Sequence, residues 1–298
     1  MQGKLIAVMG TNASGKSGLG IELAARYGGE VVSADSRQVF RGLDLGSGKI
    51  TPEEAKGVPH HLIDVCEPGE FFSMADFQRL AYAAIDDIGS RGKLPFLVGG
   101  TGLYIDAVCD GYVLSNIEPN LQYRRELEQL STEKLWELLE AAQPGSGVDR
   151  QNRNRVMRRL EKLHDGDDGG VHKEPRYDVL KLGVTWDRPT LCGRIDQRLK
   201  TRMAQGMLAE VQGLLDAGVS EDFLYRLGLE YRYLSQYLLG KGGSEAYMLE
   251  ELAKAIKRFA KRQMTWFRRD KTIHWLDMGA DPLAQAETLI DSFVGGSL

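Results

Sequence analysis

The chain has 298 residues, of which 42% are apolar and 27% are charged, as in ordinary folded proteins. This composition and the formal net charge of −4 exclude a largely disordered chain. The sequence lacks both a signal-peptide pattern and an apolar run of the ~18 residues that a membrane helix needs, which predicts a cytoplasmic protein without a membrane partner. Three scattered cysteines are too few for a disulfide framework or a zinc site: Cys66, Cys109 and Cys192.

The first third of the chain alternates short β-branched runs with stretches of helical periodicity. Strands are expected over residues 4–9, 30–33, 61–65 and 94–98. Helices are expected over residues 17–27 and 73–89. This alternation is typical of βαβ units and of a parallel sheet with buried strands.

A phosphate-binding loop follows the first expected strand and opens the first expected helix. It matches the pattern G-x-x-x-x-G-K-[ST] with Gly10, Thr11, Asn12, Ala13, Ser14, Gly15, Lys16 and Ser17. Its backbone N–H groups and the helix N-terminus attract an anion, Lys16 reaches a terminal phosphate, and Ser17 can hold Mg²⁺. The motif predicts a phosphate or diphosphate site without naming the compound.

Two polar residues follow other expected strands. Asp35 comes directly after the second strand, and Thr101 lies between glycines after the strand at 94–98. Because the carboxyl ends of parallel strands meet at one edge of the sheet, both side chains should face the P-loop. From its position alone, Asp35 could be a Mg²⁺ ligand, a general base or a cap of the next turn. Thr101 could be a residue of the site or only a helix N-cap.

After residue 111 the sequence becomes mainly helical and charged. Residues 118–163 are expected to be mostly helical with a break at 144–147, and 164–176 should form a polar, glycine-rich loop. A strand at 179–186, long helices near 190–217 and 244–269, and a last strand at 272–276 should follow. The predicted fold class is therefore α/β. It has a P-loop parallel-sheet core, residues 1–111 and 179–298, and a helical insertion domain, residues 112–178.

Positive charge gathers on two segments. Residues 150–162 hold six arginines or lysines and one glutamate, a local charge of +5, and residues 254–271 hold eight against one aspartate, a charge of +7. The rest of the chain therefore carries −16. Each segment alone is compatible with a solvated helix face, but two such segments in an acidic protein favour a polyanionic partner.

Several motifs together resemble the tRNA dimethylallyltransferase family, also called tRNA isopentenyltransferases. The matching stretches are GTNASGKS at 10–17, ADSRQVFRGLDLGSGK at 34–49, VPHHLIDV at 58–65, GEFFSMADF at 69–77, PFLVGGTGLYIDAV at 95–108, RNRVMRRLE at 153–161, RPTLCGRIDQR at 188–198 and AKRQMTWFRR at 260–269. Asn12 stands where the family pattern has threonine, and residues 222–233 match loosely.

The resemblance implies a reaction. The family transfers the dimethylallyl group of dimethylallyl diphosphate to the exocyclic amine of an adenine adjoining the anticodon of tRNA. On this basis the P-loop and Mg²⁺ at Ser17 hold the diphosphate as a leaving group, and Arg194 or Arg198 closes over it. Asp35 resembles the general base, and Thr101 resembles a residue that positions the adenine.

The resemblance also implies residues that contact the anticodon stem-loop. They are Asp35, Ser36, Arg37, Gln38, Thr101, Arg124, Asn154, Arg155, Val156, Met157, Arg158 and Gln263. The two basic segments would then hold stem phosphates while the site accepts one unpaired base. No obligate protein partner is evident.

Three other functions compete with this interpretation. A P-loop kinase for a metabolite would explain the P-loop and Asp35 but neither basic segment. A relative that prenylates free adenine nucleotides would not need those segments. An RNA-binding protein with an inactive nucleotide fold would have no reason to keep Gly15, Lys16, Ser17 and Asp35.

Overall fold

The computed structural model describes residues 3–113, 120–166 and 172–296. The chain divides into two compact units. The first consists of Met1–Gly111 and Pro175–Leu298, and the second of Tyr112–Glu174. No described helix is both long and apolar enough to cross a membrane.

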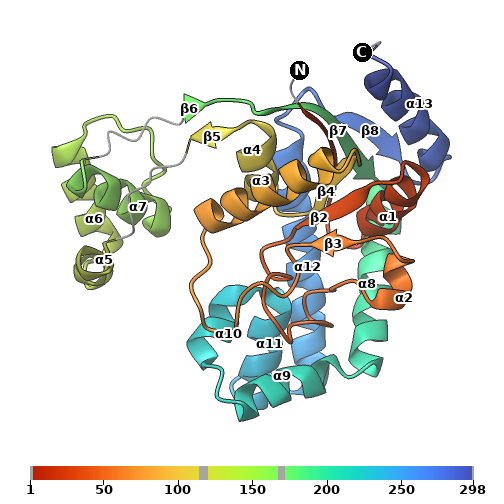
Figure 1. Ribbon diagram of the computed structural model, residues 1–298. Helices are drawn as coiled ribbons and strands as arrows, with labels where there is room; N and C mark the ends of the chain where they lie inside the picture. Colours follow the sequence, from red (N-terminus) through yellow and green to blue (C-terminus); the bar gives the residue numbers. More distant parts are fainter. Residues whose placement is uncertain (1–2, 114–119, 167–171, 297–298) are drawn as a thin grey trace. The chain divides into compact units, whose positions relative to one another are not determined.

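A parallel sheet of six strands, counted over the described residues, forms the centre of the first unit (Figure 1). Its order is β3-β2-β4-β1-β7-β8. The strands are β1 (Gly3–Gly10), β2 (Glu30–Ala34), β3 (His60–His61), β4 (Pro95–Gly99), β7 (Tyr177–Thr185) and β8 (His274–Asp277). All neighbouring pairs are parallel. The predicted α/β class with a parallel-sheet core is confirmed.

Alternate residues of β1 build two separate cores, because successive side chains of a strand point to opposite faces. Leu5, Ala7 and Met9 pack with α3 (Met74–Ser90) and α4 (Gly102–Cys109). Ile6 and Val8 pack with α1 (Lys16–Arg26) and α13 (Pro282–Val294), which lie on the other face of the sheet. Both faces are therefore covered, which explains why the strands are continuous apolar runs.

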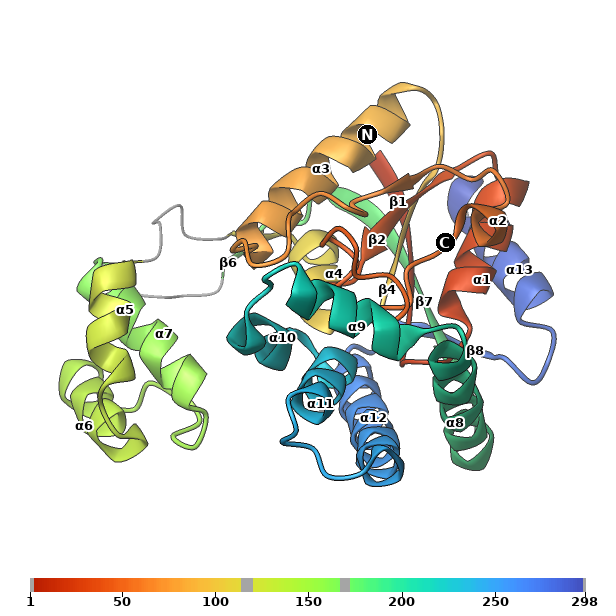
Figure 2. The same cartoon turned by 90° about the horizontal axis from the view of Figure 1, so that it is seen from below.

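A group of helices lies beside the carboxyl-terminal edge of the sheet (Figures 1 and 2). It consists of α8 (Arg188–Ala204), α9 (Met207–Asp216), α10 (Glu221–Leu227), α11 (Leu229–Leu238) and α12 (Glu245–Phe267), and a short α2 (Pro52–Ala55) precedes β3 in the chain. The helices share a core with Val39, Phe40 and Leu43 from the loop after β2. The helical region predicted near 190–217 is two helices, because Gly206 adopts a left-handed φ of 100° and separates α8 from α9.

The strand predicted over 61–65 is also wrong beyond its first residue. Leu62 and Asp64 adopt left-handed φ angles of 63° and 56°, which no strand permits. Instead, the backbone N–H groups of Asp64 and Val65 donate to the carbonyls of Gln38 and Val39. This segment therefore supports the loop that follows Asp35.

The second unit is a small helical domain. It contains α5 (Leu121–Glu128), α6 (Thr132–Ala142) and α7 (Arg153–His164), with a short antiparallel pair formed by β5 (Tyr112–Val113) and β6 (His172–Lys173). Its core is made of Leu127, Leu135, Leu139, Val156, Met157 and Leu160. The predicted break at 144–147 separates α6 from α7. Part of the predicted polar loop, residues 167–171, and residues 118–119 of the predicted helical region lie outside the described residues.

Candidate active site

The P-loop lies at the end of β1 and leads directly into α1. Gly15 adopts a left-handed φ of 91° at the N-cap and supplies no side-chain cap to the first turn. The backbone N–H groups at the start of α1 are therefore left to a ligand, and the helix dipole adds positive potential there. Trp186, which follows β7, donates from Nε1 to the Ser14 carbonyl at 2.9 Å and helps to fix the loop.

A cavity of about 690 Å³ opens beside this loop, and we call it the P-loop cavity. Its walls include Lys16, Ser17, Arg194, Arg198 and Arg202. Arg194 donates from Nε to the Ala13 carbonyl at 2.9 Å, and its guanidinium lies 4.8 Å from the Trp186 ring centre. Arg194 is thus anchored at the rim of the P-loop.

Positive charge in this cavity is poorly compensated. Burial lowers the pKa of Lys16 to about 8, with Asp35 opposing the shift and Arg198 adding to it. Burial and repulsion from Arg202 lower the pKa of Arg198 to about 9. Within the described chain, neither Arg198 nor Arg202 has a hydrogen bond or ion pair from its side chain. Such a cluster favours a multiply charged anion, because the anion would neutralise these partly buried cations.

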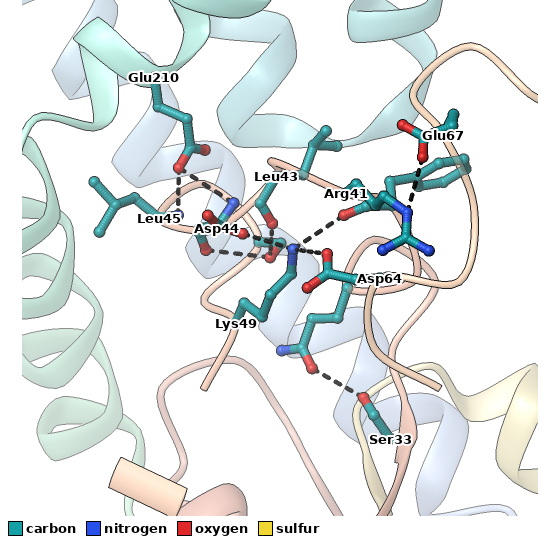
Figure 3. A network of polar contacts seen from close by, with 12 residues as sticks. Ser33, Arg41, Leu43, Asp44, Leu45, Lys49, Asp64, Glu67 and Glu210 are labelled. Atoms are coloured by element: carbon teal, nitrogen blue, oxygen red, sulfur yellow. Dashed lines mark hydrogen bonds and ion pairs between the residues drawn. The ribbon is translucent and has the colours of Figure 1, made fainter. Parts of the chain in front are cut away.

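The amine of Lys49, which also lines the P-loop cavity, is engaged elsewhere. It binds the carboxylates of Asp64 (2.5 Å) and Asp44 (2.6 Å) and the carbonyl of Phe40 (3.0 Å; Figure 3). Lys49 therefore stabilises the loop after β2, and the other cations of the cavity are the ones available to bind an anion.

A second cavity of about 430 Å³ contains Asp35 and Thr101, and we call it the Asp35 cavity. The Asp35 carboxylate accepts a hydrogen bond from the Arg37 backbone N–H at 2.9 Å, as in a capped turn. Thr101 occupies the N-cap position of α4 but makes no side-chain cap bond. Its hydroxyl instead accepts from the Ser36 backbone N–H at 3.1 Å. The carboxyl ends of β2 and β4 therefore meet here, with both polar side chains together.

Lys16, which lines the P-loop cavity, lies beside Gly100, which lines the Asp35 cavity. A Cβ atom added to Gly100 would lie 3.4 Å from Cε of Lys16 and 2.9 Å from Nε2 of Gln263. The buried side chain of Gln263 bonds to the loops on both sides of it. It accepts a hydrogen bond from the Asn12 N–H of the P-loop and donates one to the Gly100 carbonyl after β4, each at 2.9 Å. A substrate whose charged group lies in the P-loop cavity could thus present its other end to Asp35.

The side chains of Arg37 and Gln38 are bonded within the protein. Arg37 donates to the buried carboxylate of Glu230 at 2.9 Å. Gln38 accepts from the Ser33 hydroxyl at 2.9 Å and donates to the Gly48 carbonyl at 3.0 Å. With Gln263, they hold the site together, and their contact with RNA stays a prediction.

The predicted contact residues of the second unit divide into two groups. Val156 and Met157 are buried in its core, so their side chains pack inside the unit. Asn154 and Arg155 are exposed. Arg124 and Arg158 are partly exposed, and both pair with the fully buried Glu161, at 3.6 Å and 3.2 Å.

The basic segment at 254–271 runs along α12 and just beyond it. Lys254 pairs with Glu250 and Glu251, and Lys257 pairs with Asp196. In the described part of the chain, the remaining cations of α12 and the next turn have no carboxylate partner: Arg258, Lys261, Arg262, Arg268, Arg269 and Lys271. This face therefore keeps most of its positive charge.

Sequence reasoning did not identify three residues that shape the cavities. Arg202 lies one helical turn after Arg198 on α8, and that spacing of four residues could have found it. Trp266 lines the Asp35 cavity and donates from Nε1 to the Asp106 carboxylate at 2.9 Å. No pattern in the local sequence indicates the role of Glu210, a residue of α9 that contacts the loop after β2.

Comparisons with known proteins identify the family of the chain. A family model described as IPP transferase matches residues 38–270, and one described as isopentenyl transferase matches residues 3–67. A tRNA dimethylallyltransferase of Geotalea daltonii is 45% identical over 95% of this chain and 93% of its own length. One from Syntrophotalea carbinolica is 46% identical over 94% of this chain and 96% of its own.

A solved structure shows the same similarity in three dimensions. The tRNA isopentenylpyrophosphate transferase of Bacillus halodurans is 38% identical, with a TM-score of 0.75 over 99% of this chain and 96% of that protein. Sequence and fold thus agree over nearly the whole length. The chain belongs to the tRNA dimethylallyltransferase family.

Proposed function

We propose that this protein transfers the dimethylallyl group from dimethylallyl diphosphate to the N6 amine of the adenosine next to the anticodon in tRNA, releasing diphosphate. It is a prenyltransferase whose substrates are a prenyl diphosphate and tRNA. The observation that carries the proposal is the contact between Lys16, in a cavity lined by partly buried cations, and Gly100, in the cavity that contains Asp35.

The P-loop cavity would bind the diphosphate. The backbone N–H groups of residues 10–17, Lys16 and the guanidinium groups of Arg194 and Arg198 supply hydrogen-bond donors and positive charge. Both act on the charge that the bound diphosphate already carries and that it keeps as it leaves, so they contribute to substrate binding as well as to the transition state. Arg202 adds a further cation on the same wall.

The donor set of the P-loop cavity fits Mg²⁺. Ser17 offers one hydroxyl, and the described residues include no group of three or more histidine, cysteine, aspartate or glutamate side chains that could hold a metal alone. Mg²⁺ commonly keeps several waters and binds through one or two protein ligands together with substrate phosphates. Ser17 would hold the ion, which would neutralise charge on the diphosphate.

Asp35 would act as the general base. The N6 nitrogen forms a bond to C1 of the dimethylallyl group while the C1–O bond breaks and its electron pair leaves with diphosphate. The amine proton passes to the Asp35 carboxylate, because the delocalised lone pair of the amine makes it a weak nucleophile until that proton is removed. Thr101, beside Asp35, would position the adenine.

The exposed cations support tRNA as the acceptor. The α12 face and the exposed Arg155 offer phosphate contacts that a free nucleotide would not need. An anticodon loop base is already unpaired, so moving it into the Asp35 cavity costs less than extracting it from a duplex.

A matched pair of acceptors tests this proposal. Labelled dimethylallyl diphosphate is incubated with an anticodon stem-loop that carries adenosine next to the anticodon, or with the same stem-loop carrying inosine there. Inosine keeps the purine ring but lacks the exocyclic amine. Label in the adenosine stem-loop alone supports the proposal, and equal labelling of both would refute transfer to N6.

A further inference from the structure

A carboxylate on α9 holds a loop that forms one wall of the P-loop cavity. Glu210 accepts hydrogen bonds from three consecutive backbone N–H groups: Asp44 (3.2 Å) and Leu45 (2.6 Å), both in Figure 3, and Gly46 (3.1 Å). It also accepts from the hydroxyl of Tyr231 on α11, at 2.9 Å. Hydrogen bonds to a carboxylate are stronger than those between neutral groups, so this contact fixes the loop firmly to the helices.

The loop behaves as one unit from residue 44 to residue 49. The carbonyl of Asp44 accepts from the backbone N–H groups of Gly48 (2.8 Å) and Lys49 (3.0 Å). Gln38 donates to the Gly48 carbonyl, and the Lys49 amine binds Asp44 and Asp64. A shift at residues 44–46 would therefore be transmitted to Gly48 and Lys49.

Gly48 connects this loop to a cation of the cavity. Its φ of +69° favours glycine, and a Cβ atom there would overlap the guanidinium of Arg202. Arg202 therefore lies against the backbone of the loop, and both line the P-loop cavity with Leu45. The position of the loop determines where this guanidinium can lie.

We propose that Glu210 is a positioning residue for the diphosphate substrate. It sets the cavity wall and the place of Arg202 without touching the substrate itself. The inference rests on the proposed function, because it assumes that a prenyl diphosphate occupies the P-loop cavity. The bonds that hold Asp35 and Thr101 come from Arg37 and Ser36, so Glu210 governs binding of the diphosphate rather than the bond-forming step.

Glu210→Gln tests the proposal with little change in size. One acceptor oxygen becomes an NH₂ donor that faces backbone N–H groups, so the loop must move. We expect the KM for dimethylallyl diphosphate to rise about tenfold, while kcat at saturation and the KM for tRNA stay within about twofold. Glu221→Gln, the same change in a carboxylate that binds Lys241 and Gln236, should leave all three constants unchanged.

A second variant reaches the same loop from the opposite side. In Gly46→Ala, the new Cβ would lie 2.6–3.0 Å from ring atoms of Tyr231 and would displace the turn while the Glu210 carboxylate itself is kept. The same selective rise in KM is expected, together with weaker binding of inorganic diphosphate in calorimetry. This variant decides the question if Glu210→Gln does not fold.

Two results would overturn the proposal. One is an unchanged KM for dimethylallyl diphosphate in folded Glu210→Gln or Gly46→Ala protein, even if the melting temperature falls. The other is an equal loss in kcat and in both KM values, which would indicate a general structural role. Absence of transfer by the unmodified protein would instead refute the proposed function, so the two failures are distinguishable.

Discussion

The side-chain oxygen of Gln263 accepts a hydrogen bond from the backbone N–H of Asn12 at 2.9 Å, although the two residues are 251 positions apart. The amide nitrogen of Gln263 donates to the Gly100 carbonyl at the same distance. One buried side chain on α12 therefore links the P-loop to the loop after β4. The spacing between the P-loop and the Asp35 cavity depends on this bridge.

Gln263→Leu should weaken the fold and the site together. The variant leaves the Asn12 N–H and the Gly100 carbonyl buried without partners, which should lower the free energy of unfolding by about 2–4 kcal/mol. Urea unfolding measures the loss. Gln236→Leu removes one bond to Glu221, in a less buried setting, and should cost less than about 1 kcal/mol. Equal losses in the two variants would contradict the bridging role.

Asp35→Asn should abolish transfer and preserve tRNA binding. An asparagine side chain still offers an oxygen to the Arg37 N–H, so the turn should keep its shape. Without the base, kcat should fall by about 10²–10⁴-fold. Single-turnover transfer and filter binding of tRNA measure the two effects. Loss of tRNA binding with normal turnover by the bound fraction would rule out the base assignment.

The partly buried charge of Lys16 should lower the stability of the protein when no anion is bound. Burial lowers the pKa of Lys16 from 10.5 to about 8, so between these values the unfolded chain binds more protons and stability rises with pH. Lys16→Met should therefore be more stable than the parent at pH 7, by about 3 kcal/mol, and this advantage should vanish near pH 10.5. Thermal unfolding across this range checks the trend. An advantage that is constant with pH would contradict it.

The contribution of Asp106 to stability should fall as the pH rises, which is the opposite of the dependence expected for Lys16, and it should do so at acidic pH. Burial raises its pKa from 3.8 to about 6, so the folded protein binds more protons between these values and loses stability as pH rises. Asp106→Asn keeps an acceptor for Trp266 and removes the charge. It should be more stable than the parent at pH 7 by about 1–2 kcal/mol, allowing for partial exposure, and equal to it below pH 4. Urea unfolding followed by tryptophan fluorescence provides the measurement, and a variant less stable at pH 7 would refute the prediction.

Arg155→Glu should weaken tRNA binding in a salt-dependent way. Arg155 is exposed on α7, and each lost phosphate contact should reduce the slope of log Kd against log salt by about 1. Binding titrations at several salt concentrations give the slope. Arg79→Glu, a change at an exposed arginine of α3, is the control and should alter the slope less. Identical slopes for the two variants would show that Arg155 is an ordinary surface cation that contacts no phosphate of the tRNA.

The sheet and the P-loop could be predicted because their signals are local. Buried parallel strands are continuous apolar runs, and the P-loop needs glycines at fixed spacing. The positions of Asp35 and Thr101 followed from the rule that strand ends converge, and the structure does bring them together through Ser36. The choice between a base and a ligand did not follow, because both roles need the same carboxylate.

The errors arose where tertiary contacts override local pattern. Residues 62–65 look like a strand, but their backbone bonds to the loop after Asp35 require left-handed angles at Leu62 and Asp64. Glu210 could not be predicted, because its partners lie 164–166 residues earlier and are backbone N–H groups that carry no sequence signal.

The most direct test of the central claim compares acceptors in one experiment. Labelled dimethylallyl diphosphate is supplied with tRNA or with AMP, and hydrolysis of ATP is followed in parallel. We predict that label enters tRNA, that AMP stays unlabelled, and that ATP is not rapidly hydrolysed. Label in AMP alone, or rapid ATP hydrolysis without prenyl transfer, would contradict the assignment of the P-loop cavity to a prenyl diphosphate used on tRNA.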